Sequence, residues 1–162
     1  MFYNSKENTY IQEGQAFTID GNQYAANWLN LSTPEEKLAI GLEEVVATNS
    51  PASDTYYWVS STLDKATLTY TNTPKDLAQV KTNAVSQVNA SAYSILLPSD
   101  WMAVKAFETS TPIDPTWNGW RAMIRTEAAN AITAINSATD VDAVATAAQV
   151  NWTQDPNAPV VA

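Results

Sequence analysis

The side chains that could do chemistry in this chain are carboxylates, hydroxyls and tyrosines, because its 162 residues include no histidine and no cysteine. Those two residue types supply the commonest nucleophile–base pairs and the imidazole and thiolate ligands of zinc sites. The polar groups that remain need a shaped pocket before they can catalyse a reaction, and spacing in the sequence does not define one. Most charged side chains lie at protein surfaces. We therefore expect a protein that is not an enzyme and that holds no cofactor and no metal ion.

Two arginines form the one other pattern that could bind or react. Arg121 and Arg125 are one helical turn apart, and Asp100 lies on the segment before them. An ion pair of Asp100 with Arg121 or with Arg125 would fix the turn of the chain at Pro98. The alternative is a site for an anion, because arginine grips carboxylates through two hydrogen bonds.

The chain is acidic, with eight basic residues against seventeen acidic ones and a net charge of −9. A phosphate backbone would be repelled, so nucleic acid is not an expected partner. No apolar run approaches the ~20 residues that span a bilayer, and the N-terminus lacks the pattern of a secretory signal. We expect no membrane insertion.

Residues 1–72 have the pattern of a β-rich domain. The Asp-Gly-Asn turn at 20–22 lies between two β-prone runs, and a second pair of such runs flanks residues 63–65, so two hairpins are expected. Segment 33–41 begins with a capping box that includes a proline and ends at a glycine, which predicts one short helix.

From residue 73 the apolar residues recur every three or four positions, which is the period of a helix. We expect Thr73 to cap the first helix and Pro74 to begin it, with a break before Pro98. Four helices are expected, over 74–97, 99–107, 117–136 and 139–148. The remaining residues, 153–162, form an extended tail that should need a partner to be ordered. The fold class is thus α+β, with a β-rich domain at 1–72 and a helical domain at 73–162.

Three tryptophans lie on helix faces that must meet in such a domain. Trp101, Trp117 and Trp120 are large apolar groups, and each buried aromatic side chain removes roughly 150–250 Å² from water. We expect them to belong to the core and not to a binding site.

Aromatic residues in the β-rich domain point to a contact surface. Tyr56, Tyr57 and Trp58 are consecutive on an expected strand, so at least one of them must face away from the core side of the sheet. Tyrosine and tryptophan often anchor protein interfaces. The alternative is that the protein's own helices cover this second aromatic face. Phe2 and Tyr3 pose the same choice.

Two groups of residues resemble conserved elements of a known family. The first comprises Gly21, Tyr24, Trp28, Leu29, Thr33, Pro34, Glu35, Glu36 and Gly41, and the second comprises Asp100, Trp101, Trp120, Arg121 and Arg125. In this order they resemble small bacteriophage tail proteins, particularly those called tail fibre assembly proteins or chaperones. The resemblance covers residues 17–46 and 74–136, and Ala25 replaces the proline that follows the tyrosine in the family.

The resemblance implies a role in folding, trimerisation or attachment of a tail fibre through protein binding. The implied partner is a tail-fibre or other tail protein, trimeric in the fibre case, and the implied location is the host cytoplasm during assembly. One alternative is a permanent virion component, such as a fibre or baseplate adaptor or a fibre-tip subunit, retained on the tail. Another is a carbohydrate-binding or glycan-active module, because aromatic platforms with carboxylates hold and cleave sugars. A pair of carboxylates ~5–9 Å apart in an aromatic cleft would support the hydrolytic form.

Overall fold

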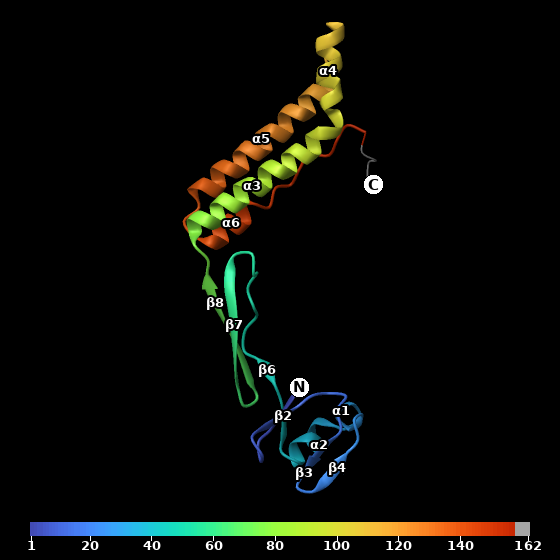
Figure 1. Cartoon of the computed structure of the whole chain (residues 1–162), viewed down its shortest axis with the longest axis vertical. Coiled ribbons are helices and arrows are strands. Elements are labelled where there is room, and N and C mark those ends of the chain that lie inside the picture. The colour runs from blue at the N-terminus through green and yellow to red at the C-terminus, as the bar shows by residue number, and fades with distance from the viewer. Residues whose placement is uncertain (158–162) are drawn as a thin grey trace. The chain divides into compact units, whose positions relative to one another are not determined.

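The computed structural model describes residues 1–157 of the chain, and these residues form an α+β protein (Figure 1). The chain divides into two compact units, Met1–Thr73 and Pro74–Ala162. Small β-sheets occupy the first unit and helices occupy the second, so the predicted fold class is confirmed. No helix among the described residues is long and apolar enough to cross a membrane.

A three-stranded antiparallel sheet begins the first unit. Its central strand is β1 (Phe2–Asn4), which pairs with β2 (Thr9–Ile11) on one side and with β5 (Leu42–Glu44) on the other. All three residues of β1 are buried, because the strand has a neighbour along each edge and packing on both faces.

The predicted hairpin at residues 20–22 is confirmed. Strand β3 (Phe17–Ile19) pairs with β4 (Asn22–Tyr24), and the two turn residues between them, Asp20 and Gly21, have φ values of 52° and 77°. Aspartate and glycine tolerate this left-handed conformation, which two-residue hairpin turns require. Residues from both sheets then share one apolar core, which comprises Phe2, Ile11, Ile19, Leu29 and Leu42.

Two short helices close this core, where the sequence predicted one. Helix α1 (Trp28–Leu31) directly precedes the expected helix α2 (Pro34–Ala39). The capping box of α2 is present, with the Thr33 hydroxyl accepting from the Glu36 amide at 3.2 Å. Gly41 follows the helix with a φ of 89°, and a Cβ atom there would lie 3.0 Å from Cγ of Lys6. Glycine suits this position because side chains rarely adopt such a φ, and the Lys6 side chain would also have to shift to make room for a Cβ atom.

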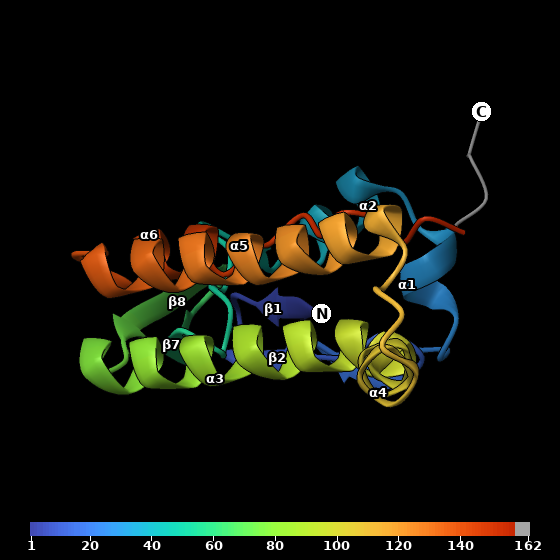
Figure 2. The same ribbon diagram turned by 90° about the horizontal axis from the view of Figure 1, so that it is seen from above.

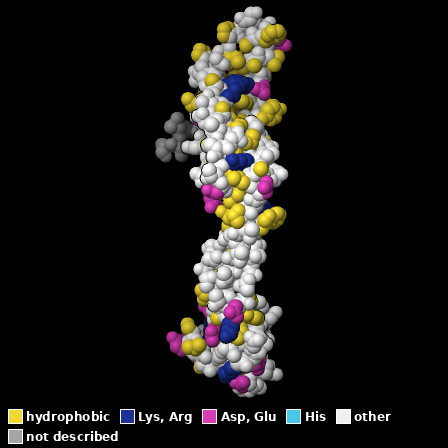
Figure 3. Space-filling model, turned by 90° about the vertical axis from the view of Figure 1, so that its left-hand side faces the viewer, with side chains coloured by type: hydrophobic (Ala, Val, Ile, Leu, Met, Phe, Trp, Pro, Cys, Tyr) yellow, Lys and Arg dark blue, Asp and Glu magenta, His cyan; other side chains and the backbone are white. Residues whose placement is uncertain are grey.

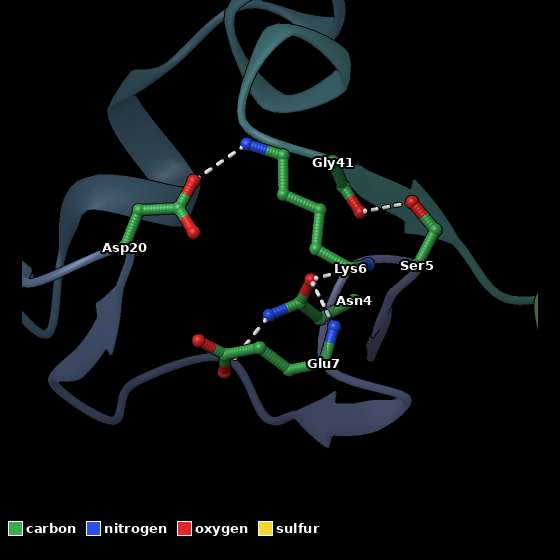
Figure 4. Close-up of polar contacts among 6 residues, drawn as sticks. All are labelled: Asn4, Ser5, Lys6, Glu7, Asp20 and Gly41. Carbon is green, nitrogen blue, oxygen red and sulfur yellow. Dashed lines mark hydrogen bonds and ion pairs between the residues drawn. The ribbon is translucent and has the colours of Figure 1, made fainter.

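A buried asparagine organises the turn after β1 (Figure 4). The side-chain oxygen of Asn4 accepts from the Lys6 amide at 3.1 Å, and its amide nitrogen donates to the Glu7 carboxylate at 3.2 Å. The ammonium of Lys6 lies 2.7 Å from the Asp20 carboxylate, so this turn is tied to the β3–β4 hairpin. Asn4 is fully buried and its polar atoms are satisfied, as buried polar groups must be.

The third sheet of this unit has the order β6–β8–β7, in which β6 (Val46–Ala47) runs parallel to β8 (Thr67–Pro74). Strand β7 (Tyr57–Asp64) joins β8 through a turn at Lys65, whose φ is 51°. The second predicted hairpin therefore exists, but its strands are longer and its turn lies later than the sequence indicated. No residue of the three strands is buried.

Side-chain amides continue the pairing along β8 beyond β6. The amide of Asn49 accepts from the Tyr70 backbone N–H and donates to the Tyr70 carbonyl, both at 2.8 Å. Asn72 accepts in the same way from the Ala52 backbone N–H at 3.0 Å. This edge of β8 is thus occupied, whereas β7 is the opposite edge of the sheet.

Two long helices form the frame of the second unit. Helices α3 (Leu77–Leu96) and α5 (Pro115–Ser137) lie side by side, and α6 (Val141–Ala147) packs against both (Figures 1 and 2). Between α3 and α5 the chain passes through a 3₁₀ turn, η1 (Leu97–Ser99), and through α4 (Asp100–Thr109).

The start of α3 differs from the prediction. Asp76, not Thr73, is the N-cap, and its carboxylate accepts from the Gln79 amide at 2.8 Å. Residues 73 and 74 belong to β8, so pairing in the sheet overrides the capping signal at Thr73-Pro74. The other predicted start at Asp114-Pro115 is confirmed, because Asp114 accepts from the Thr116 amide at 2.9 Å.

The core of the second unit follows the predicted helical stripes. Its buried apolar members are Val80, Ala84, Val88 and Ala92 of α3, Trp120, Ile124, Ala128, Ala131 and Ile135 of α5, and Val141 and Val144 of α6. Four of these residues are alanines of α3 and α5, whose small side chains let the two helices approach closely.

Candidate functional site

The turn between α3 and α4 is held by one buried arginine. Arg121 of α5 is 5% exposed, and its guanidinium donates to the Leu96 carbonyl at 3.1 Å, to the Ser99 hydroxyl and to the Asp100 carboxylate at 2.6 Å. The predicted ion pair of Asp100 is therefore confirmed, with Arg121 as the partner. Charge-assisted bonds of this kind are the stronger ones, so they fix the direction in which α4 leaves.

The second arginine does not join this cluster. Arg125 is exposed and donates to the backbone carbonyl of Arg121 at 3.3 Å. Because the guanidinium of Arg121 is already engaged by three groups of its own chain, the two side chains do not face a common anion. The alternative reading of the pair as an anion site gains no support from this geometry.

Helix α4 is where the structure departs most from the sequence prediction. None of its residues is buried, and Trp101, expected in the core, is 57% exposed. The physical reason is that α4 turns away from the α3–α5 pair after η1, and Figure 2 shows it end-on while α3 and α5 lie across the view. The side of α4 that stays half-buried carries Met102 and Ala106 instead.

The opposite side of α4 presents apolar groups to the surroundings. Trp101, Val104 and Phe107 are 57%, 58% and 89% exposed. Tyr93 of α3 and Leu97 of η1, which precede them in the chain, are 63% and 49% exposed. We call these five residues the α4 face. Hydrophobic side chains are spread over the helical unit in Figure 3. The sequence reasoning missed the exposure of α4, although Trp101, Val104 and Phe107 recur every three residues along it.

The three aromatics that we expect at a contact surface of the first unit differ in their exposure. Trp58 lies on β7 and is 67% exposed, whereas Tyr57 is half-buried. Tyr56 is also half-buried and lies in the turn before β7, so the three aromatics are not all on one strand as predicted.

Phe2 and Tyr3 do not belong to a contact surface. Each is 5% exposed, because β1 is the central strand of its sheet. Phe2 is part of the apolar core, and the hydroxyl of Tyr3 donates to the Asn8 side chain at 3.0 Å. The prediction that this pair contacts a partner is corrected accordingly.

The remaining motif tryptophans have structural surroundings. Trp28 packs edge-on against Tyr24, with ring centres 4.9 Å apart, beside the core of the first unit. Trp120 is 8% exposed, as predicted for a core residue, and its ring meets that of the half-buried Trp117 at 84°.

The segment after α6 returns along the helices, and we call its residues 149–157 the strap (Figure 1). Its central residue is Thr153, whose carbonyl accepts from the Trp120 ring N–H at 3.0 Å. The amide of Thr153 donates to the Glu127 carboxylate at 3.1 Å, and its hydroxyl donates there too. Thr153 of the expected tail thus bonds to a helix of its own chain. That the tail needs a partner stays a prediction, and residues 158–162 lie outside the described residues.

Acidic residues do not gather into an ion site in the described part of the chain, because no group of three or more carboxylates is placed to hold a metal ion. The features that could bind something are thus the α4 face, the β7 edge with Trp58, and the pocket beneath the strap. A comparison of the chain with protein-family models, with curated proteins and with solved structures found no match.

Proposed function

We propose that this protein acts by binding another protein chain, as an assembly or attachment factor for a bacteriophage tail fibre. The observation that carries the proposal is the α4 face, where a helix of ten residues with no buried side chain turns its tryptophan, valine and phenylalanine outward. Exposed large apolar groups are individually common, but contiguous patches of them mark interaction sites.

The size of the α4 face supports a protein partner. Its three aromatics, Tyr93, Trp101 and Phe107, are exposed by more than half of their surface. At roughly 150–250 Å² for a whole aromatic side chain, they present on the order of 300–500 Å². This sum is comparable to the area of the largest apolar patch on an ordinary monomer, and a standard interface takes about 800 Å² from each partner.

The β7 edge supplies a second surface of the same kind. From Tyr57 to Leu63 the strand contains no charged residue and no proline, although natural edge strands usually carry such groups to prevent pairing with other chains. Trp58 adds an exposed aromatic at its start. An extended strand of a partner could pair along this edge and cover the indole.

The identity of the partner rests on the resemblance to tail fibre assembly proteins. The residues that carry this resemblance have structural roles in the chain. Gly21 makes a hairpin turn, Trp28 packs on a core and Arg121 orients α4. Such roles favour a shared fold, and function is then inferred from the surfaces that the fold presents. The net charge of −9 further favours a partner whose matching surface is neutral or basic.

The test is co-expression with the tail-fibre gene that the proposal expects beside the gene for this chain. We expect the intact protein to raise the yield of soluble fibre and to purify with it. Phe107→Ser should abolish both effects, because a polar side chain at this 89% exposed position removes the most accessible apolar group without touching the core. Trp58→Ala should weaken the complex more than it weakens the fold.

A matched control is Leu31→Ser, which removes an apolar side chain that is 77% exposed in the other unit. All three variants should melt close to the parent temperature. Absence of co-purification at low and at moderate salt, together with unchanged fibre solubility, would contradict the proposal. Detection of the polypeptide in purified virions would identify it as a permanent tail component and not as a chaperone that leaves.

A further inference from the structure

A pocket of about 760 Å³ lies beneath the strap, within the helical unit. Its walls come from the end of α3, the start of α5 and the strap itself. The lining residues are Ser94, Ile95, Pro98, Ser99, Trp117, Trp120, Trp152, Thr153, Gln154, Asp155 and Asn157. The volume falls in the range of about 300–1,000 Å³ that is usual for small-molecule sites.

Tryptophans form the apolar walls of this pocket. Trp117 and Trp152 are half-buried, so part of each ring borders the open space. Trp120 is nearly covered, and its ring N–H bond to Thr153 holds the strap in place at one end of the pocket. The rings are therefore positioned by the fold before any ligand arrives.

Polar residues of the strap also line the pocket. Gln154 and Asn157 are exposed, and a side-chain amide offers both hydrogen-bond donors and an acceptor. The hydroxyl of Ser94, also exposed, adds a third group of the same capability from α3. A ligand with several hydroxyl groups, each of which donates and accepts, matches this set.

The charge of the lining narrows the class of ligand. Asp155 is the one charged residue among the described residues that line the pocket, and its carboxylate accepts from the backbone N–H of Asn157 at 2.8 Å. Without a lysine or an arginine in the lining, a phosphate or a carboxylate would meet only a negative group. The ligand should therefore carry no negative charge.

We infer that this pocket binds a neutral oligosaccharide. A pyranose ring has an apolar C–H face, which the rings of Trp117 and Trp152 can contact, and a rim of hydroxyls, which Gln154 and Asn157 can bond. Among the described residues the lining holds one carboxylate and not two, so these residues do not supply the pair that glycoside hydrolysis requires. The inference is therefore binding without cleavage.

A quaternary ammonium ion is the main rival, because tryptophans can also form a cage around such a cation. A cage needs several open ring faces around one point. Trp120 is only 8% exposed and offers little of its face, and the lining also contains side-chain amides and hydroxyls, with which a quaternary ammonium ion cannot form hydrogen bonds. These features favour the sugar. The inference does not depend on the proposed function, since the α4 face and the β7 edge take no part in it.

The experiment uses the intact chain. It is screened on an array of neutral hexose and N-acetylhexosamine oligosaccharides, and the best binder is titrated by calorimetry, with choline chloride as the rival probe. We expect saturable binding of a neutral oligosaccharide and none of choline. Gln154→Ala should weaken binding about tenfold, the effect of losing one or two hydrogen bonds to the ligand, and Trp152→Ala should weaken it further.

Gln149→Ala is the matched control, because Gln149 is an exposed strap residue outside the lining. It should bind like the parent. Since Gln154 is exposed, its variant should fold normally even if Trp152→Ala disturbs the strap, and thermal melts of each variant check this. No binding to any neutral oligosaccharide at millimolar concentration would overturn the inference, as would binding of choline alone or equal affinity in the parent and both pocket variants.

Discussion

The single side chain of Arg121 determines the direction of α4 and so which apolar side chains the helical unit exposes. A buried guanidinium is costly unless its donors are satisfied, and here a carbonyl, a hydroxyl and a carboxylate satisfy them. All three acceptors lie between Leu96 and Asp100. The arginine therefore fastens the turn before α4, and the outward direction of Trp101 and Phe107 follows from it.

Trp120→Ala should cost roughly 3–5 kcal/mol of unfolding free energy, because it removes a core side chain and leaves a cavity. It also removes the ring N–H that holds Thr153. Urea unfolding of the variant beside the parent measures the loss. Trp101→Ala is the control, and at 57% exposure it should stay within about 1 kcal/mol of the parent. Parental stability of Trp120→Ala with loss of partner binding would instead make Trp120 an interface residue.

At the scale of elements, the sequence before α3 contains two residues that could cap the helix, Thr73 and Asp76, and only Asp76 does so. Asp76→Ala should destabilise the helical unit by about 1 kcal/mol, because the Gln79 amide loses its acceptor. Thr73→Ala should change stability by no more than about 0.5 kcal/mol, since Thr73 belongs to a strand and caps nothing. Chemical denaturation of both variants tests this, and a larger loss for Thr73→Ala would place the helix start at Pro74.

Periodicity predicted α3 and α5 well, because each helix buries one stripe against the other and a 3.6-residue repeat records this directly. The same reasoning failed for α4. Apolar residues at helical spacing form the same sequence pattern whether or not another element covers them. Trp101 was therefore predicted to be a core residue. What decides its exposure is the turn fastened by Arg121, which is a tertiary contact and leaves no periodic signal.

The candidate pocket was beyond the reach of sequence patterns for a similar reason. Trp117 and Trp152 are far apart in the chain, and only the return of the strap along α3 and α5 brings them to one space. The strap has no regular structure, so neither helical nor strand periodicity marks it. In the first unit, by contrast, local turn chemistry at Asp20-Gly21 and the capping box at Thr33 predicted elements correctly, because those signals are contained within a few residues.

For the whole molecule, the charge composition leads to a prediction about metal ions. The seventeen acidic residues are scattered, and the chain has no histidine or cysteine that could bind a metal more tightly. Isolated carboxylates hold divalent ions weakly. Addition of EDTA should therefore change neither the melting temperature nor the binding of a partner, as followed by calorimetric scans with and without the chelator. A large fall in melting temperature would reveal an ion on which the fold depends.

The third sheet should be sensitive to slow deamidation of Asn49. Its two hydrogen bonds to Tyr70 require a donor and an acceptor on one exposed side chain. Deamidation to aspartate would remove the donor and place a carboxylate oxygen against the Tyr70 carbonyl. A preparation stored long enough would thus lose pairing along β8 without any break in the chain, and fresh and aged samples would differ in the sheet whose opposite edge, β7, is proposed to meet a partner.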